Sequence, residues 1–304
     1  MSSIKIGLII QGPISSFGNG PNNSRGGFDA KEVVYKNINT FDSHVDKIIV
    51  STWKGSGLNN LEIGQSAVLL ESEPILGFDF LNQRKQFFSM NAGLEWLRTN
   101  SDCTHAIKIR TDQLIPLELI DWTKEFYSAS LFSEKYQKDY LIFSEGLKAE
   151  SFYAGDFIIA GTLSDLSKLC NAVLVTKKIV HPMNAADYIL KWLQSLDVKY
   201  LNGCSPLLIS LLTAKNSIKI QRLWNQVLNA RISLFPREII KKIIWRGKPI
   251  TEVIQSLDTA FFFNEDISFR GENLEDVRSL RKTFKLMREY WRRYLTAKQA
   301  YKKV

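Results

Sequence analysis

The sequence predicts an α/β protein with a mainly parallel sheet, helices on both faces of that sheet, and a helical, basic C-terminal extension. Short apolar runs of strand length recur along the first half of the chain, and amphipathic segments separate them. The 304 residues are 45% hydrophobic, which is enough to bury a sizeable core and excludes a disordered chain. The 40 basic and 31 acidic residues give a net charge of +9.

The elements are taken in chain order from their periodicity and their end signals. The predicted strands are residues 4–10, 45–52, 66–71, 105–111, 141–144 and 157–160. The predicted helices are residues 29–40, 82–98, 185–196, 206–214 and 274–301. Asp29 and Glu32 have the spacing of a capping box at the start of the first helix.

Several classes of protein are excluded by what the chain does not contain. The three cysteines (Cys103, Cys170 and Cys204) have no metal-site spacing and fit a reducing cytosol. No apolar run approaches the ~20 residues of a membrane span, and the N-terminal run is too short for a signal peptide. The glycine-rich stretch at 17–27 matches neither a P-loop nor a dinucleotide fingerprint. We therefore expect a cytoplasmic protein.

Polar triplets follow the first four predicted strands. They are Gln11-Gly12-Pro13, Ser51-Thr52-Trp53, Glu71-Ser72-Glu73 and Arg110-Thr111-Asp112. Because the carboxyl ends of parallel strands meet at one edge of a sheet, we expect these triplets to converge on a ligand site.

The fourth triplet carries the strongest chemical pattern. Asp112, at the mouth of a buried strand, is placed to hold Mg²⁺ or Mn²⁺ between two phosphates, although a strand-end aspartate is often only a turn residue. Lys108 and Arg110 share one side of that strand and need anionic partners, either protein carboxylates or a ligand phosphate.

Other polar residues are candidates with structural alternatives. Asn82, Arg84, Lys85 and Gln86 open a helix whose N-terminus attracts anions, although they also suit a solvated first turn. Transfer to a hydroxyl acceptor needs a base, for which Asp156 and Asp187 are candidates, although both also suit cap or turn positions.

Nine basic residues and one acid lie between residues 281 and 304. Apolar residues at helical spacing alternate with them, a pattern that suits an anionic membrane surface and equally a terminal helix docked on its own domain. Residues 235–246 repeat this character. Nucleic-acid binding is the weaker alternative, because no recognised motif accompanies the charge.

Four motifs together carry a resemblance over roughly residues 4–190. Gln11-Gly12-Pro13, Ser51-Thr52-Trp53, the Asn82…Lys85-Gln86…Ser89…Gly93-Leu94 helix and Lys108-Ile109-Arg110-Thr111-Asp112 resemble the WavE lipopolysaccharide-synthesis family. The resemblance implies a GT-A-like glycosyltransferase domain over residues 1–230, with residues 231–304 as the extension. It implies transfer of a sugar from a nucleotide-sugar donor to a lipid-linked or glycan acceptor, in lipopolysaccharide, O-antigen or capsule synthesis at the inner membrane.

The resemblance also assigns residues. The first two motifs would line the nucleotide pocket, and Asp112 would stand at the last acid of the Asp-x-Asp metal motif. Arg110 replaces the first acid, which leaves dependence on Mn²⁺ or Mg²⁺ open. Asp187 is the first candidate for the base and Asp156 the second. Two alternatives are sugar-phosphate or phosphoryl transfer on the same fold, and a non-catalytic protein that binds membrane or nucleic acid through its tail.

Overall fold

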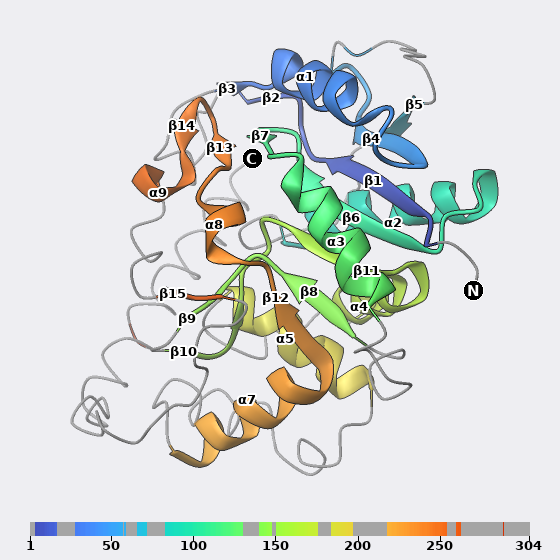
Figure 1. Ribbon diagram of the computed structural model, residues 1–304. Helices are drawn as coiled ribbons and strands as arrows, with labels where there is room; N and C mark the ends of the chain where they lie inside the picture. The colour runs from blue at the N-terminus through green and yellow to red at the C-terminus, as the bar shows by residue number, and fades with distance from the viewer. Residues whose placement is uncertain are drawn as a thin grey trace.

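A seven-stranded sheet forms the centre of the computed structural model (Figure 1). The structure describes residues 4–16, 28–56, 58, 66–71, 83–129, 140–147, 150–175, 184–196, 218–253, 260–262 and 288. The strand order is β12-β8-β11-β6-β1-β4-β5. The strands are β1 (Ile6–Gln11), β4 (Lys47–Trp53), β5 (Ser66–Glu71), β6 (His105–Arg110), β8 (Leu141–Phe143), β11 (Ile159–Thr162) and β12 (Ile232–Leu234). All run in one direction except β11, which is antiparallel to β6 and β8.

Helices cover both faces of the sheet (Figure 1). They are α1 (Lys31–Phe41), α2 (Gln83–Asn100), α3 (Glu118–Ser128), α4 (Leu163–Val175), α5 (Asn184–Ser195), α7 (Ile218–Arg231), α8 (Arg237–Ile240) and α9 (Ile250–Val253). Successive strand side chains point to opposite faces, so Ile9 of β1 packs in the core with α2, α4 and α5, whereas Leu8 and Ile10 pack with α1 and α3. The predicted α/β class, with its mainly parallel sheet and helices on both faces, is confirmed.

Smaller strands add three outlying sheets. β2 (Ser15–Ser16) pairs with β3 (Phe28–Asp29), and β9 (Gly146–Leu147) lies between β10 (Glu150–Ala154) and β15 (Ala260–Phe261). β7 (Gln113–Leu114) pairs with β13 (Ile244–Trp245), which pairs with β14 (Lys248–Pro249). This last sheet holds the β13–β14 hairpin beside the end of β6.

Three local expectations need correction. The N-cap of α1 is Ala30, without a side-chain cap, so the capping box of Asp29 and Glu32 is wrong; the Asp29 carboxylate accepts from the backbone N–H of Lys31 at 2.9 Å. β11 begins two residues later than the strand predicted from residue 157. The helices α3, α4 and α7, and the short helices α8 and α9, are not among the predicted elements.

The predicted domain boundary at residue 230 does not follow the fold. β12 completes the main sheet beside β8, and Phe235, Ile240 and Ile243 are buried in the core. Most apolar residues of the 235–246 segment are therefore buried in the protein interior, and Ile244 is the exposed exception. The helices predicted at 206–214 and 274–301 lie outside the described residues, as does the basic segment 281–304 apart from Arg288. Among the helices described, none has the length and apolar character that crossing a bilayer requires.

Candidate active site

The carboxyl ends of β1, β4 and β6 meet at one edge of the sheet, as the sequence predicts. The Gly12 N–H donates to the Ser51 carbonyl at 3.1 Å, and the Thr111 N–H donates to the Gln11 carbonyl at 3.1 Å. The Thr111 hydroxyl donates to the Pro13 carbonyl at 2.7 Å. These three hydrogen bonds hold the triplets after the strands together.

Gly12 needs to be glycine for this junction to form. Its φ of +126° lies in the region that residues with a side chain rarely adopt. A β-carbon there would also lie 3.3 Å from the Thr111 hydroxyl oxygen. The chain can consequently turn sharply after β1 and leave the Gln11 side chain at the sheet edge.

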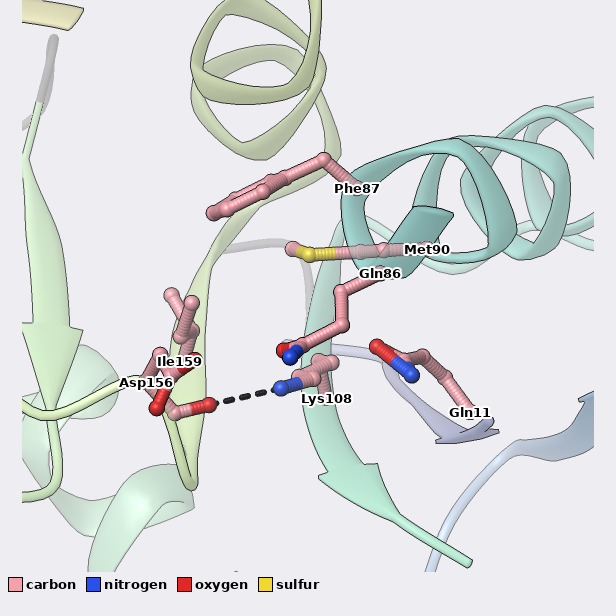
Figure 2. A pocket seen from close by; sticks show the side chains of 7 residues that line it. All are labelled: Gln11, Gln86, Phe87, Met90, Lys108, Asp156 and Ile159. Atoms are coloured by element: carbon pink, nitrogen blue, oxygen red, sulfur yellow. Dashed lines mark hydrogen bonds between the residues drawn. The ribbon is translucent and has the colours of Figure 1, made fainter. Parts of the chain in front are cut away.

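A small pocket opens beside this junction, between β6, α2 and the turn before β11 (Figure 2). Its empty volume is about 160 Å³ including the part open to solvent, and the enclosed part is too narrow to hold a water molecule, so the described residues form only part of a small-molecule site. Its lining residues are Gln11, Gln86, Phe87, Met90, Lys108, Asp156 and Ile159. Four of these (Gln11, Gln86, Lys108 and Asp156) were predicted site residues.

Lys108 is the buried cation of this pocket. Its ammonium donates to the backbone carbonyl of Asp156 at 2.6 Å, the contact drawn in Figure 2, and the residue is only 2% exposed. Burial, with a smaller contribution from the neighbouring Arg110, lowers the pKa of Lys108 to about 8 against the opposing charge of Asp156. An anion placed here would raise this pKa again, because a nearby opposite charge favours the ionised form.

Two amides complete the polar wall. With its amide oriented to satisfy both neighbours, Gln11 donates to the Gln86 carbonyl at 3.3 Å and accepts from the Gly12 N–H at 3.2 Å. Figure 2 shows the Gln11 and Gln86 side chains beside Lys108, with Phe87 and Met90 from the same helix as Gln86. Amides next to a cation and an apolar wall are groups suited to a polar ligand with a flat ring.

The second triplet, Ser51-Thr52-Trp53, is not among the residues that line the pocket. The Ser51 hydroxyl donates to the Ser89 carbonyl at 2.7 Å, and the Ser89 hydroxyl donates back to the Ser51 carbonyl at 2.9 Å, which ties β4 to α2. The Thr52 hydroxyl is buried, and Trp53 stacks on Phe88 with ring centroids 6.5 Å apart. The described pocket does not include these residues, so their assignment to the nucleotide stays a prediction.

The start of α2 is only partly in the pocket. Gln86 lines it, whereas Arg84 donates to the Leu174 carbonyl of α4 at 3.2 Å and Lys85 is half-buried outside the lining. Asn82 lies outside the described residues. The assignments of Asn82, Arg84 and Lys85 to the donor therefore stay predictions.

Asp112 is held by three donor side chains. Its Oδ1 accepts from Arg110 Nε at 2.9 Å, and its Oδ2 accepts from Arg110 Nη2 at 3.0 Å, forming a bidentate pair. The same Oδ2 accepts from Trp245 Nε1 at 2.9 Å and from Arg246 Nε at 2.9 Å. Burial opposes ionisation, but the Arg110 charge and these hydrogen bonds hold the pKa of Asp112 well below its usual range.

This donor set does not fit a divalent cation. A magnesium or manganese site needs several oxygen ligands, whereas the Asp112 carboxylate already accepts four hydrogen bonds and has two guanidinium groups beside it. Within the described part of the chain, no group of three histidine, cysteine or acidic side chains is placed to bind a metal ion.

Glu145, a buried residue that follows β8, is not among the predicted site residues. Glu145 is 2% exposed, and neither carboxylate oxygen has a hydrogen-bond partner in the described residues. Burial raises the pKa of Glu145 to about 7, and the charge of Asp156 contributes to the increase. β8 points the same way as β6, so Glu145 lies at the same edge of the sheet as the pocket. Because the carboxyl ends of parallel strands meet at one edge of a sheet, the strand predicted at residues 141–144 is a signal that could have identified Glu145.

The two predicted bases, Asp156 and Asp187, differ in what the structure describes of them. Asp156 lines the pocket next to Lys108. Asp187 lies in the first turn of α5, but the position of its side chain is outside what the structure describes. Of the two, the structure brings only Asp156 to the described pocket.

Comparison with solved structures gives weak similarities. The 4-diphosphocytidyl-2C-methyl-D-erythritol synthase of Anaerococcus prevotii aligns with a TM-score of 0.39 at 11% identity, over 64% of this chain and 85% of that one. HddC from Yersinia pseudotuberculosis gives 0.37 at 13% identity, over 84% and 98%. The galactosyltransferase LgtC gives 0.36 at 14% identity, over 62% and 70%. Neither a family profile nor a curated sequence matches the chain, so the WavE resemblance stays a prediction.

Proposed function

We propose that this protein is a transferase that takes a sugar from a nucleotide-sugar donor. The observation that supports the proposal most is the buried Lys108 ammonium in a pocket with the Gln11 and Gln86 amides at the carboxyl edge of a parallel sheet. A buried cation whose one hydrogen bond among the described residues goes to a backbone carbonyl is suited to an anionic ligand, and the amides are suited to a base or a ribose.

The proposed chemistry needs two actions from the chain. Lys108 and Arg110 stabilise the negative charge that develops on the phosphate of the departing nucleotide, since fixed cations in a site with little water act strongly on developing charge. A carboxylate accepts the proton of the attacking hydroxyl. We assign this base to Asp156, because it lines the pocket beside Lys108, and keep Asp187 as the alternative.

The acceptor and the cellular setting belong to the same proposal. A lipid-linked or oligosaccharide acceptor of lipopolysaccharide, O-antigen or capsule follows from the resemblance of the four motifs. The basic segment 281–304 would hold the enzyme at the anionic inner surface of the membrane, which vesicle flotation with and without anionic lipid tests.

Thermal shift tests the binding of the donor. The full chain is screened against UDP, GDP, CMP, dTDP and phosphoribosyl pyrophosphate, with Mn²⁺ or with EDTA, because a ligand that binds the folded state raises Tm. We expect one nucleotide to raise Tm, and Lys108→Met to abolish the rise. Lys124→Met is the matched control, since Lys124 also donates to a backbone carbonyl, that of His44 at 2.6 Å, but outside the pocket.

Two outcomes would change the assignment. If no nucleotide raises Tm, the transferase proposal is wrong, and binding through the basic segment becomes the reading to test. If a donor binds and the acceptor product gains phosphorus by mass spectrometry, the reaction is phosphoryl or sugar-phosphate transfer rather than glycosyl transfer.

A further inference from the structure

Arg110 and Arg246 come from distant parts of the chain and meet at one carboxylate. Arg110 ends β6, whereas Arg246 lies in the turn between β13 and β14, and both donate to Asp112 through Nε at 2.9 Å. Two guanidinium groups and one carboxylate leave this cluster with one excess positive charge. Asp112 is 2% exposed, but each arginine side chain is 21% exposed, so part of each guanidinium group reaches solvent.

Several donors of the two guanidinium groups are unused. Arg110 donates from Nε and Nη2, and Arg246 donates from Nε alone. Within the described residues, Nη1 of Arg110 and both terminal nitrogens of Arg246 have no acceptor. Guanidinium groups with free N–H donors bind phosphate with directional, charge-assisted hydrogen bonds.

Aromatic rings restrict the orientation of both groups. The Arg110 guanidinium carbon lies 5.6 Å from the Trp245 ring centroid, and that of Arg246 lies 5.4 Å from the same ring. Phe28 lies 4.4 Å from the Arg246 group. Held by rings and a shared carboxylate, the free donors have little side-chain entropy left to lose when they bind an anion.

The backbone at Arg246 indicates that this side chain is kept for its chemistry. Arg246 has a φ of +51° and Gly247 a φ of +78°, so both residues of the two-residue hairpin turn adopt a conformation that asparagine and glycine favour. A non-glycine residue there costs on the order of 1 kcal/mol. An arginine in this place fits a requirement for the side chain rather than for the turn.

The cluster adjoins the pocket. Arg110 is the register partner of Gln11 and lies two residues after Lys108 on the same face of β6. The Arg110 charge lowers the Lys108 pKa, so an anion between them would relieve a repulsion. Phe157, which follows Asp156, lies 5.9 Å from the Arg110 guanidinium carbon.

We propose that Arg110 and Arg246, oriented by Asp112, bind the diphosphate of the donor directly, at the position where the resemblance implies a metal ion. The inference rests on the proposed function and adds Arg246, a residue outside the four motifs, to the site. It makes diphosphate binding independent of divalent cations.

Inorganic pyrophosphate is the probe, titrated by calorimetry into the full chain in EDTA. We expect binding in EDTA, and a loss of about tenfold or more in affinity in Arg246→Gln, the size that removal of a hydrogen bond to a charged group produces. Arg98→Gln is the matched control: this arginine pairs with Glu95 at the exposed end of α2 and should leave the affinity unchanged. Uridine and UDP are compared next, and the substitution should weaken only UDP.

Arg246→Lys is a second variant that distinguishes a loss of binding from a folding defect. It keeps a charge beside Asp112 but has one amino group in place of the fork, so it should also lose affinity while circular dichroism stays that of the native protein. The proposal is overturned if pyrophosphate binds only with Mn²⁺, or binds all variants equally. If nucleotides still raise Tm in a Lys108-dependent way, either result overturns diphosphate binding by the two arginines but not the proposed function.

Discussion

The carboxyl group of Glu145 occupies the space that a side chain on residue 155 would need. A β-carbon built on Gly155 would lie 2.2 Å from Glu145 Oε1, and the Gly155 N–H donates to the Glu145 backbone carbonyl at 2.7 Å. The two residues therefore fix each other immediately before Asp156, the acid of the pocket. The position of the proposed base depends on a glycine and on a buried carboxyl behind it.

Gly155→Ala should destabilise the fold by about 1–3 kcal/mol, the usual cost of overpacking. Glu145→Ala in the same chain should restore most of the loss, because the added methyl group then has room. Urea unfolding of the two single variants and of the double variant measures the coupling. Additive losses would contradict the contact.

Glu145→Gln should change how stability depends on pH. The folded carboxyl titrates at about 7 and the free one at 4.5, so the folded state binds more protons between these values and this group's contribution is lost as pH rises through that window. We expect the free energy of unfolding of Glu145→Gln to rise relative to that of the wild type between pH 5 and pH 8, by as much as about 3 kcal/mol. Above pH 8 the difference should stay constant. Denaturation at pH 5, 6, 7 and 8 measures the difference, with the exposed Glu252→Gln as the flat control.

Asp112→Asn should lower the free energy of unfolding by about 3 kcal/mol, because it removes the charge of a buried carboxylate that accepts from Trp245 and from two partly exposed arginines. The control is Asp102→Asn, since Asp102 makes a solvent-exposed pair with Lys5 and should change stability far less. Urea unfolding compares both with the wild type. A stable Asp112→Asn protein that loses only a Mn²⁺-dependent thermal shift would restore the metal assignment.

Donor binding should weaken above pH 8. Because the Lys108 pKa is about 8, the free protein loses this charge as pH rises. Binding of the phosphate above pH 8 then requires the Lys108 amine to take up a proton. Affinity for the nucleoside diphosphate that stabilises the protein most should fall by up to about tenfold per pH unit between pH 8 and 9. Calorimetry at pH 7, 8 and 9 measures it, and Lys108→Arg, which stays charged, should flatten the profile. An unchanged wild-type profile would place the phosphate away from Lys108.

The sequence predicted the sheet because its strands are continuous apolar runs, and it predicted the pocket edge because parallel strands end together. It could not predict the partners of Asp112, since Trp245 and Arg246 approach from more than 130 residues away through a short hairpin. The 235–246 segment has the composition of an amphipathic surface helix, and only its packing shows that Phe235 and Ile240 are buried.

Hydrogen–deuterium exchange on the full chain tests whether the donor binds at the carboxyl edge of the sheet. The ligand is the nucleoside diphosphate that gives the largest thermal shift. We expect slower exchange in residues 108–113 and 154–159, and the same protection in EDTA. Protection confined to segments away from this edge, with these two unchanged, would contradict it.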